Sequence, residues 1–208
     1  WSDFTAYDWR DVRWRYFAAA LLTCSGAMLL TFVRWFVLVW AQGFPFRLHD
    51  ALRLGFIGYV FNFLGPGSVG GDLVKAVLIV REQQSRRMIA AATVVIDRIV
   101  GLLALLIIGA LAVLVPTRLS LDPAFAAGKA VFWIGSAVGL VALAVTMHPA
   151  LPRSRWLNRL VHWPVVGRPI GELINALLIY QTRRRIVLFT IVLSLISHLG
   201  LLVGFYLG

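Results

Sequence analysis

Four long apolar stretches constrain this chain more than any other feature, at residues 16–40, 88–115, 130–147 and 186–208. A helix needs about 20 mostly apolar residues to cross a bilayer. Hydrophobic residues make up 60% of the chain and charged residues only 14%, against about 25% charged in a soluble domain. Too few polar side chains remain to cover a water-facing surface. The sequence therefore predicts an all-α, polytopic membrane helix bundle, with residues 1–208 forming one transmembrane domain.

The segment 50–80 is different, because its two apolar pieces, 51–64 and 73–80, are each too short to span a membrane. Between them lies the run Gly-Pro-Gly-Ser-Val-Gly-Gly-Asp at 65–72. Glycine and proline interrupt helices. We therefore expect one broken or re-entrant helix around residues 50–80.

The distribution of Arg and Lys between loops predicts the orientation. Residues 1–15, 81–87 and 148–185 are rich in Arg, whereas 41–49 and 116–129 carry few basic residues. The positive-inside rule places the rich loops in the cytoplasm and the poor ones outside. This alternation requires segment 50–80 to cross once, which favours a broken helix over a hairpin. The expected location is the cell inner (plasma) membrane, with several passes.

Residues 149–182 are expected to form a basic cytoplasmic connector. Four prolines interrupt its course, and three consecutive arginines follow it. Within it, residues 170–180 place apolar side chains on one helical face. This pattern predicts an amphipathic helix lying at the membrane interface.

Several kinds of chemistry are disfavoured by the residue inventory. A single cysteine, Cys24, excludes an intramolecular disulfide and a cysteine-based metal cage, and the four histidines have no metal-ligand spacing. The Gly-x-Gly-x-x-Gly match at 65–70 lacks the strand that a dinucleotide site needs. We expect no cofactor, no metal site and no enzymatic activity of this chain alone. The net charge of +11 is split between loops, which favours anionic lipid over nucleic acid as its partner.

Charged side chains inside the apolar stretches are the first candidate site residues. Asp97 and Arg98 lie about ten residues into a long span, where a charge is costly unless it is paired or hydrated. Adjacent helical residues diverge, so each needs a partner on another helix. The candidate pairs are Asp72 with Arg98 and Arg34 with Asp97. Such pairs could be purely structural, or an Arg could meet a phosphate. Arg34 could alternatively extend to the interface.

The interruption in segment 50–80 supplies the second group of candidates. A helix beginning near Asp72 would direct the free amides of Gly70, Gly71 and Asp72 into a cavity, where they could bind an anion. Asp72 could instead cap that helix, in the anion's place. Asn62 precedes the break and could cap exposed backbone. Lys75 lies one turn into the second half-helix and could face the same cavity.

These residues together resemble one family. Asn-Phe-Leu-Gly-Pro-Gly at 62–67, Gly-Gly-Asp at 70–72, Lys75, and Asp-Arg followed by Gly-Leu at 97–102 are similar to motifs of the lysylphosphatidylglycerol synthase transmembrane region, or flippase-like domain, family. Arg34-Trp35 also resembles its pattern. The family implies about eight spans, so the chain resembles a piece of a larger protein. A second Pro-Gly-Gly-x-Gly segment and a soluble synthase domain, found in relatives, are absent here.

The resemblance implies a function in lipid handling. Some family members move aminoacylated phosphatidylglycerol across the bilayer, and others accompany isoprenoid or hopanoid lipid pathways. We expect translocation or binding of an anionic phospholipid or isoprenoid-linked lipid; the alternative is an accessory membrane subunit or membrane domain of an aminoacyl- or glycosyl-lipid transferase. A synthase partner and a homo-oligomer are compatible with either. The expected substrate-binding residues are Arg34, Asn62, Gly67, Gly70, Gly71, Asp72, Lys75, Asp97 and Arg98.

Overall fold

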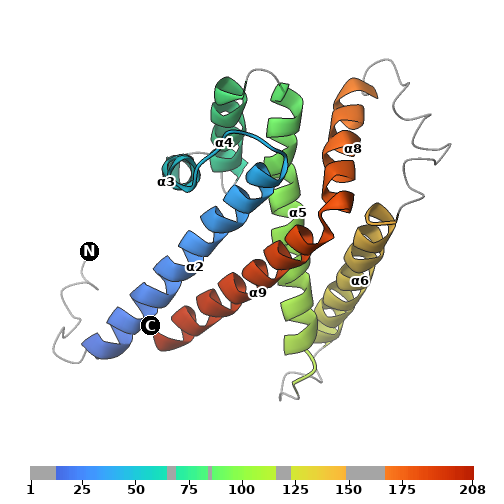
Figure 1. Ribbon diagram of the computed structural model, residues 1–208. Coiled ribbons are helices and arrows are strands. Elements are labelled where there is room, and N and C mark those ends of the chain that lie inside the picture. Colours follow the sequence, from blue (N-terminus) through green and yellow to red (C-terminus); the bar gives the residue numbers. More distant parts are fainter. Residues whose placement is uncertain (1–12, 65–68, 84–85, 116–122, 149–166) are drawn as a thin grey trace.

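The described part of the chain, in a computed structural model, comprises residues 13–64, 69–83, 86–115, 123–148 and 167–208, and all of its regular structure is helical. Figure 1 shows the helices, which are α2 (Trp14–Ala41), α3 (Leu48–Leu64), α4 (Val69–Glu82), α5 (Arg87–Ala112), α6 (Pro123–Thr146), α8 (Gly167–Thr182) and α9 (Arg184–Leu207). The prediction of an all-α membrane helix bundle is confirmed.

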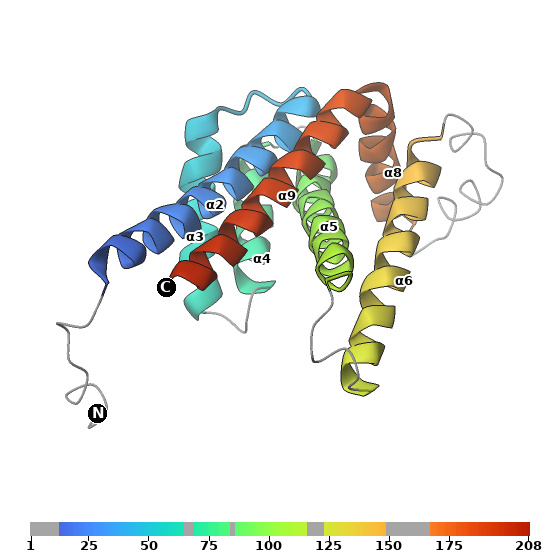
Figure 2. The ribbon, with the colours of Figure 1, turned by 90° about the horizontal axis from the view of Figure 1, so that it is seen from below.

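Helices α2 and α9 lie side by side and run in opposite directions (Figures 1 and 2). Gly200 and Gly204, four residues apart on α9, face α2, and an added Cβ on Gly204 would lie 2.3 Å from Cys24 Sγ. Small residues at this spacing allow helix backbones to approach closely in membranes. Ser197 Oγ adds a hydrogen bond of 2.9 Å to the carbonyl oxygen of Ala27. Close packing and an interhelical hydrogen bond thus join α2 to α9.

Helix α5 stands between the α3 and α4 helices on one side and α6 and α8 on the other, in both views (Figures 1 and 2). An added Cβ on Gly109 of α5 would lie 2.2 Å from a ring carbon of Phe132 on α6. Near the other end of α6, Gln181 of α8 donates hydrogen bonds to the carbonyl oxygens of Thr146 and His148. These contacts make α5 the central element of the bundle.

Four of the helices, α2, α5, α6 and α9, are long and apolar enough to cross a membrane, over Trp14–Ala41, Arg87–Ala112, Ala127–Thr146 and Arg184–Leu207. Helices long and apolar enough to span are therefore present at all four of the expected positions. Large apolar side chains stand exposed on all four, such as Leu22, Leu105, Val141 and Phe205. An outer surface of this kind suits contact with lipid rather than with water.

Helices α3 and α4 form an antiparallel hairpin, so the expected single broken crossing is wrong. Arg53 near the start of α3 pairs with Glu82 at the end of α4. Near the other ends, Asn62 Oδ1 accepts a hydrogen bond of 2.8 Å from the backbone N–H of Gly71. The re-entrant alternative is the correct one. Helices of 17 and 14 residues are each shorter than a crossing requires, and packing them together returns the chain to the side it left.

The hairpin also shows that the loops at 41–49 and 81–87, expected on opposite sides of the membrane, lie on the same side. Arg86 Nη1 donates a hydrogen bond of 3.0 Å to the carbonyl oxygen of Gln42, and the Arg86 guanidinium lies 5.3 Å from the Phe44 ring centre. The loop at 41–49 therefore lies on the same side as the loop at 81–87, not opposite to it. Arg13, at the other end of α2, lies on the opposite side. The loop-charge rule failed because it compared only a few charges per loop.

The connector prediction is covered only in part, since residues 149–166 lie outside the described residues. The expected helix within it is present as α8, Gly167–Thr182. Its residues Ala176 and Tyr180 are buried against the bundle, and Gln42 donates a hydrogen bond of 3.1 Å to the Ala176 carbonyl oxygen. The placement of this helix at the membrane interface stays a prediction.

Cysteine labelling provides a test of the hairpin. In a Cys24→Ala background, Arg47→Cys and Arg81→Cys are expected to react with a membrane-impermeant maleimide from the same side. Leu114→Cys, which follows the single crossing of α5, should react from the other side. Labelling of Arg47→Cys and Arg81→Cys from opposite sides would show that segment 50–80 crosses the membrane after all.

Candidate functional site

A buried ion pair links α2, about two turns before its end, to the middle of α5. Arg34 Nε lies 2.7 Å from Asp97 Oδ1, and Arg34 Nη2 lies 2.9 Å from Asp97 Oδ2. The third guanidinium nitrogen, Nη1, donates a hydrogen bond of 2.8 Å to Ser194 Oγ on α9. The side chains of Arg34 and Asp97 are 6% and 10% exposed. This two-point geometry is the strong form of a charged hydrogen bond, and it joins three helices.

The absence of a side chain at Gly101 makes room for this pair. A Cβ at Gly101 would lie 2.9 Å from Arg34 Nη1. Gly101 lies one helical turn after Asp97, on the same face of α5. The expected pair of Arg34 with Asp97 is confirmed, and the alternative in which Arg34 extends to the membrane interface is wrong.

A second ion pair, between Asp72 of α4 and Arg98 of α5, also confirms its prediction. Both guanidinium nitrogens Nε and Nη2 of Arg98 contact the Asp72 carboxylate. This pair is more open than the first, because the Arg98 side chain is 50% exposed and that of Asp72 is 20% exposed. A second anion could approach the exposed guanidinium of Arg98, whereas the guanidinium of Arg34 is buried.

The first turn of α4 is packed directly on α3. The Gly71 N–H is satisfied by Asn62 Oδ1, so Asn62 has the capping role expected of it. An added Cβ on Gly71 would lie 2.0 Å from the Gly58 carbonyl oxygen. The Gly71 amide is therefore not free to bind an anion, contrary to expectation. Gly70 is partly buried in the same turn, and Gly67 lies outside the described residues.

Lys75 lies between the two ion pairs. Its ammonium nitrogen is 5.5 Å from the centre of the Phe32 ring and 5.7 Å from that of Trp35. It interacts electrostatically with the carboxylates of Asp97 and Asp72. Among the described residues, however, no carboxylate oxygen lies within ion-pair distance of Lys75.

We refer to Arg34, Asp72, Lys75, Asp97 and Arg98 as the charged cluster. It contains three side chains that are formally cationic and two that are formally anionic, and four of the five form the two ion pairs. Three positive charges less two negative ones leave one positive charge in excess. A net charge at membrane depth is costly unless an anion or water compensates it. The arrangement is thus suited to holding one additional anionic group.

Several residues of this region are not apparent from the sequence alone. Ser194 and Gly101 complete the surroundings of Arg34, and Gly58 permits the close approach of Gly71. Two features of the sequence could have indicated these residues. Ser194 is a polar residue within an apolar span, and Gly101 is a glycine one turn from a charged residue. Trp35, which the sequence offered only as part of the family pattern, is 1% exposed, and its indole N–H has no acceptor among the described residues.

A further polar side chain, His198, lies one turn after Ser194 on α9. Its Nδ1 is 2.7 Å from the Ser194 carbonyl oxygen of the same helix. Among the described residues, no group of three or more His, Cys, Asp or Glu side chains could hold a metal ion. The site therefore offers charge and hydrogen bonds for binding.

Comparisons with known proteins support the resemblance noted in the sequence. No curated protein and no solved structure matches the chain. Residues 4–207 match the family described as the lysylphosphatidylglycerol synthase TM region. The match includes the two ion pairs and Lys75, and it extends over essentially the whole chain. The chain therefore belongs to the lysylphosphatidylglycerol synthase TM region family of membrane proteins.

Proposed function

We propose that this chain binds an anionic phospholipid or lipid-linked headgroup at the charged cluster and carries it across the membrane. The observation that carries the proposal is that Lys75 lies over two aromatic rings with no carboxylate oxygen within ion-pair distance among the described residues, which leaves the cluster a formal charge of plus one. A phosphate would neutralise this charge. It would also accept hydrogen bonds from Lys75, which is a common phosphate-binding side chain.

The two ion pairs have different roles in this proposal. Arg34 and Asp97 are buried and satisfy each other, so they hold α2, α5 and α9 together and do not contact the lipid. Arg98 is half exposed and is held by Asp72. A phosphate approaching Arg98 would compete with the Asp72 carboxylate for the same guanidinium. Asp72 therefore limits how tightly the anion is held, as release requires.

The orientation that we propose rests on the arginines that gather at one end of the bundle. Arg47, Arg81, Arg86 and the three arginines at 183–185 lie at one end of the bundle, as the contacts of Arg86 with Gln42 and of Arg183 with Trp40 indicate. The positive-inside rule makes this end cytoplasmic. We propose a multi-pass protein of the cell inner membrane, with the hairpin of α3 and α4 entering from the cytoplasmic side.

Translocation can be tested in vesicles that contain the purified protein and a dye-labelled lipid. An impermeant reductant bleaches only dye in the outer leaflet. We expect the protein to expose inner-leaflet phosphatidylglycerol to the reductant, and phosphatidylcholine much less, because only the former carries a net negative charge. Lys75→Met should abolish the effect, and Lys75→Arg should retain it.

The alternative function, a membrane subunit of a lipid-modifying transferase, gives a different result. Phosphatidylglycerol would then bind to the protein, and binding would depend on Lys75, but the lipid would stay in its leaflet. That outcome would contradict the translocation part of the proposal and favour the transferase role.

A further inference from the structure

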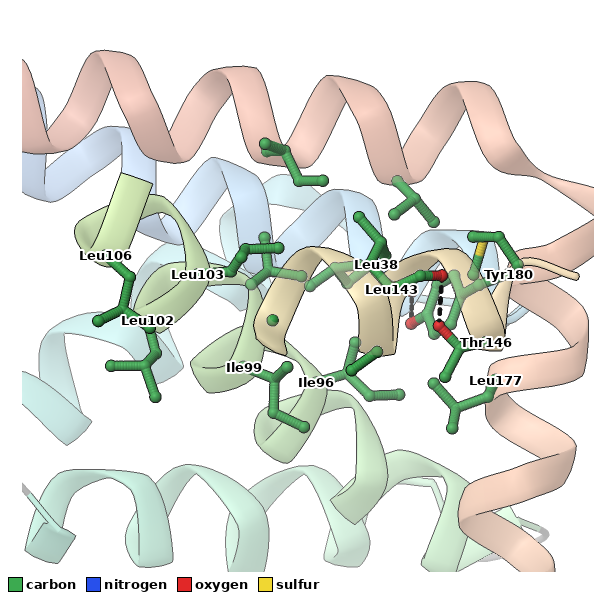
Figure 3. A pocket seen from close by; sticks show the side chains of 16 residues that line it. Leu38, Ile96, Ile99, Leu102, Leu103, Leu106, Leu143, Thr146, Leu177 and Tyr180 are labelled. Atoms are coloured by element: carbon green, nitrogen blue, oxygen red, sulfur yellow. Dashed lines mark hydrogen bonds between the residues drawn. The ribbon is translucent and has the colours of Figure 1, made fainter. Parts of the chain in front are cut away.

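An apolar pocket of about 260 Å³ lies on the side of α5 that faces α6 and α8. Figure 3 shows its walls, which come from five helices and include Leu38, Ile99, Leu103, Leu143, Leu177 and Ile191. The pocket is larger than the roughly 150 Å³ engineered cavities that stay dry and bind benzene. A pocket of this kind takes an apolar ligand.

Among the described residues of the pocket wall, the two hydroxyl groups are already hydrogen-bonded. Thr146 Oγ1 donates to the Leu143 carbonyl oxygen at 2.8 Å, and the Tyr180 hydroxyl donates to the Leu38 carbonyl oxygen at 2.8 Å (Figure 3). A buried water molecule needs two to four polar partners. The wall therefore gives water little to bind, and a hydrocarbon chain fits its chemistry.

A basic recess of about 510 Å³ lies at the turn between α8 and α9, which directly follows the pocket residue Tyr180 in the chain. It is formed by Trp40, Gln181, Thr182, Arg183, Arg184, Arg185 and Ile186. The three arginines are exposed, and the Arg183 guanidinium lies 5.9 Å from the Trp40 ring centre. Arginine and tryptophan together are typical of the interface between membrane and water.

Two hydrogen bonds connect the pocket and the recess. Gln181 and Arg184 of the recess donate to the carbonyl oxygens of Thr146 and Met147, whose side chains line the pocket. Tyr180 and Thr146 lie together at this end of the pocket in Figure 3. One molecule with an anionic head and an apolar tail could therefore occupy both.

We propose that the apolar pocket and the basic recess form a second lipid site, which holds one anionic phospholipid with an acyl chain in the pocket and its phosphate on the arginines of the recess. Charge complementarity selects an anionic headgroup, since the described residues that form the recess include three arginines and no carboxylate. On the pocket wall, Leu38 lies one helical turn from Arg34, and Ile191 lies one turn from Ser194. The buried pair of Arg34 and Asp97 therefore separates this site from Lys75. The site does not depend on the function proposed for the charged cluster.

The test uses native mass spectrometry of the purified protein, titrated with phosphatidylglycerol or phosphatidylcholine of matched long or short acyl chains. All measurements are made in a Lys75→Met background, so that lipid bound at the charged cluster does not contribute. The Lys75→Met protein without further changes should retain one long-chain phosphatidylglycerol. It should bind phosphatidylcholine and the short-chain lipid more weakly.

Two variants test the two parts of the site. Arg185→Gln should weaken phosphatidylglycerol binding about fivefold, the usual contribution of one arginine at a membrane surface, and Arg81→Gln, an exposed arginine elsewhere, should leave it unchanged. Ala142→Phe fills the pocket from an exposed position and should weaken long-chain binding at least about tenfold, as loss of about two buried CH2 groups would. Ala144→Phe, exposed on the same helix but outside the pocket, is its control.

The outcomes separate the second site from ordinary solvation by lipid. Equal binding of the two headgroups, or equal effects of Ala142→Phe and Ala144→Phe, would overturn the proposal. Loss of all lipid in the Lys75→Met parent would also overturn it, while leaving the proposal for the charged cluster intact.

Discussion

Asp97→Asn is expected to destabilise the protein by about 3–5 kcal/mol, because it leaves the Arg34 guanidinium buried without its counter-ion. Its remaining partner, Ser194, is neutral and cannot compensate the charge. The variant should give little monodisperse protein after extraction. What does fold should unfold at a much lower temperature in detergent than the parent does.

Two comparisons make this prediction specific. Asp72→Asn removes the carboxylate of the more open pair, whose Arg98 side chain is 50% exposed, and should cost clearly less stability than Asp97→Asn. The double variant Arg34→Met, Asp97→Asn removes both charges and should recover most of the lost stability. If Asp97→Asn proves as stable as Asp72→Asn, the buried pair does not hold the bundle together.

Gly71→Ala is expected to destabilise the hairpin of α3 and α4 by about 3 kcal/mol. The new Cβ would lie 2.0 Å from the Gly58 carbonyl oxygen and 2.4 Å from Asn62 Oδ1. A backbone atom cannot move aside as a flexible side chain can, so the two helices must separate. Separation would also break the hydrogen bond from the Gly71 N–H to Asn62.

The control for this change is Gly26→Ala, where an added Cβ meets nothing within 4 Å. Alanine favours a helix over glycine by about 1 kcal/mol, so this variant should be neutral or slightly stabilising. Thermal unfolding in detergent compares the two. Equal unfolding temperatures for Gly71→Ala and Gly26→Ala would contradict the close packing of α3 on α4.

The sequence was sufficient to predict the four long spans, because a run of apolar residues has few alternatives to a membrane helix. It was also sufficient for the two ion pairs. A charge in a span requires a partner, and few candidates exist in so apolar a chain. The hairpin was not predictable in the same way. A helical segment that returns and one that continues have the same hydropathy, and the choice depends on packing between Gly58 and Gly71.

The candidate site could also be predicted only in part. The charged residues could be identified one by one, but their exposure could not, and exposure separates the structural role of Arg34 from the accessible position of Arg98. The Lys75 ammonium of α4 lies over two aromatic rings of α2, although α4 itself packs on α3 and α5. Periodicity along a single helix contains no information about such contacts.

The proposed function depends on the binding of an anionic lipid next to Lys75. Native mass spectrometry can compare the affinity of phosphatidylglycerol for the parent protein, Lys75→Met and Lys75→Arg, and thermal unfolding can compare their stability. We expect Lys75→Met to weaken binding at the cluster at least about tenfold, as loss of a charge-assisted hydrogen bond does, without loss of stability. Lys75→Arg should keep the affinity. Unchanged affinity in Lys75→Met, together with a lower unfolding temperature, would instead show that Lys75 is a structural partner of Phe32 and Trp35.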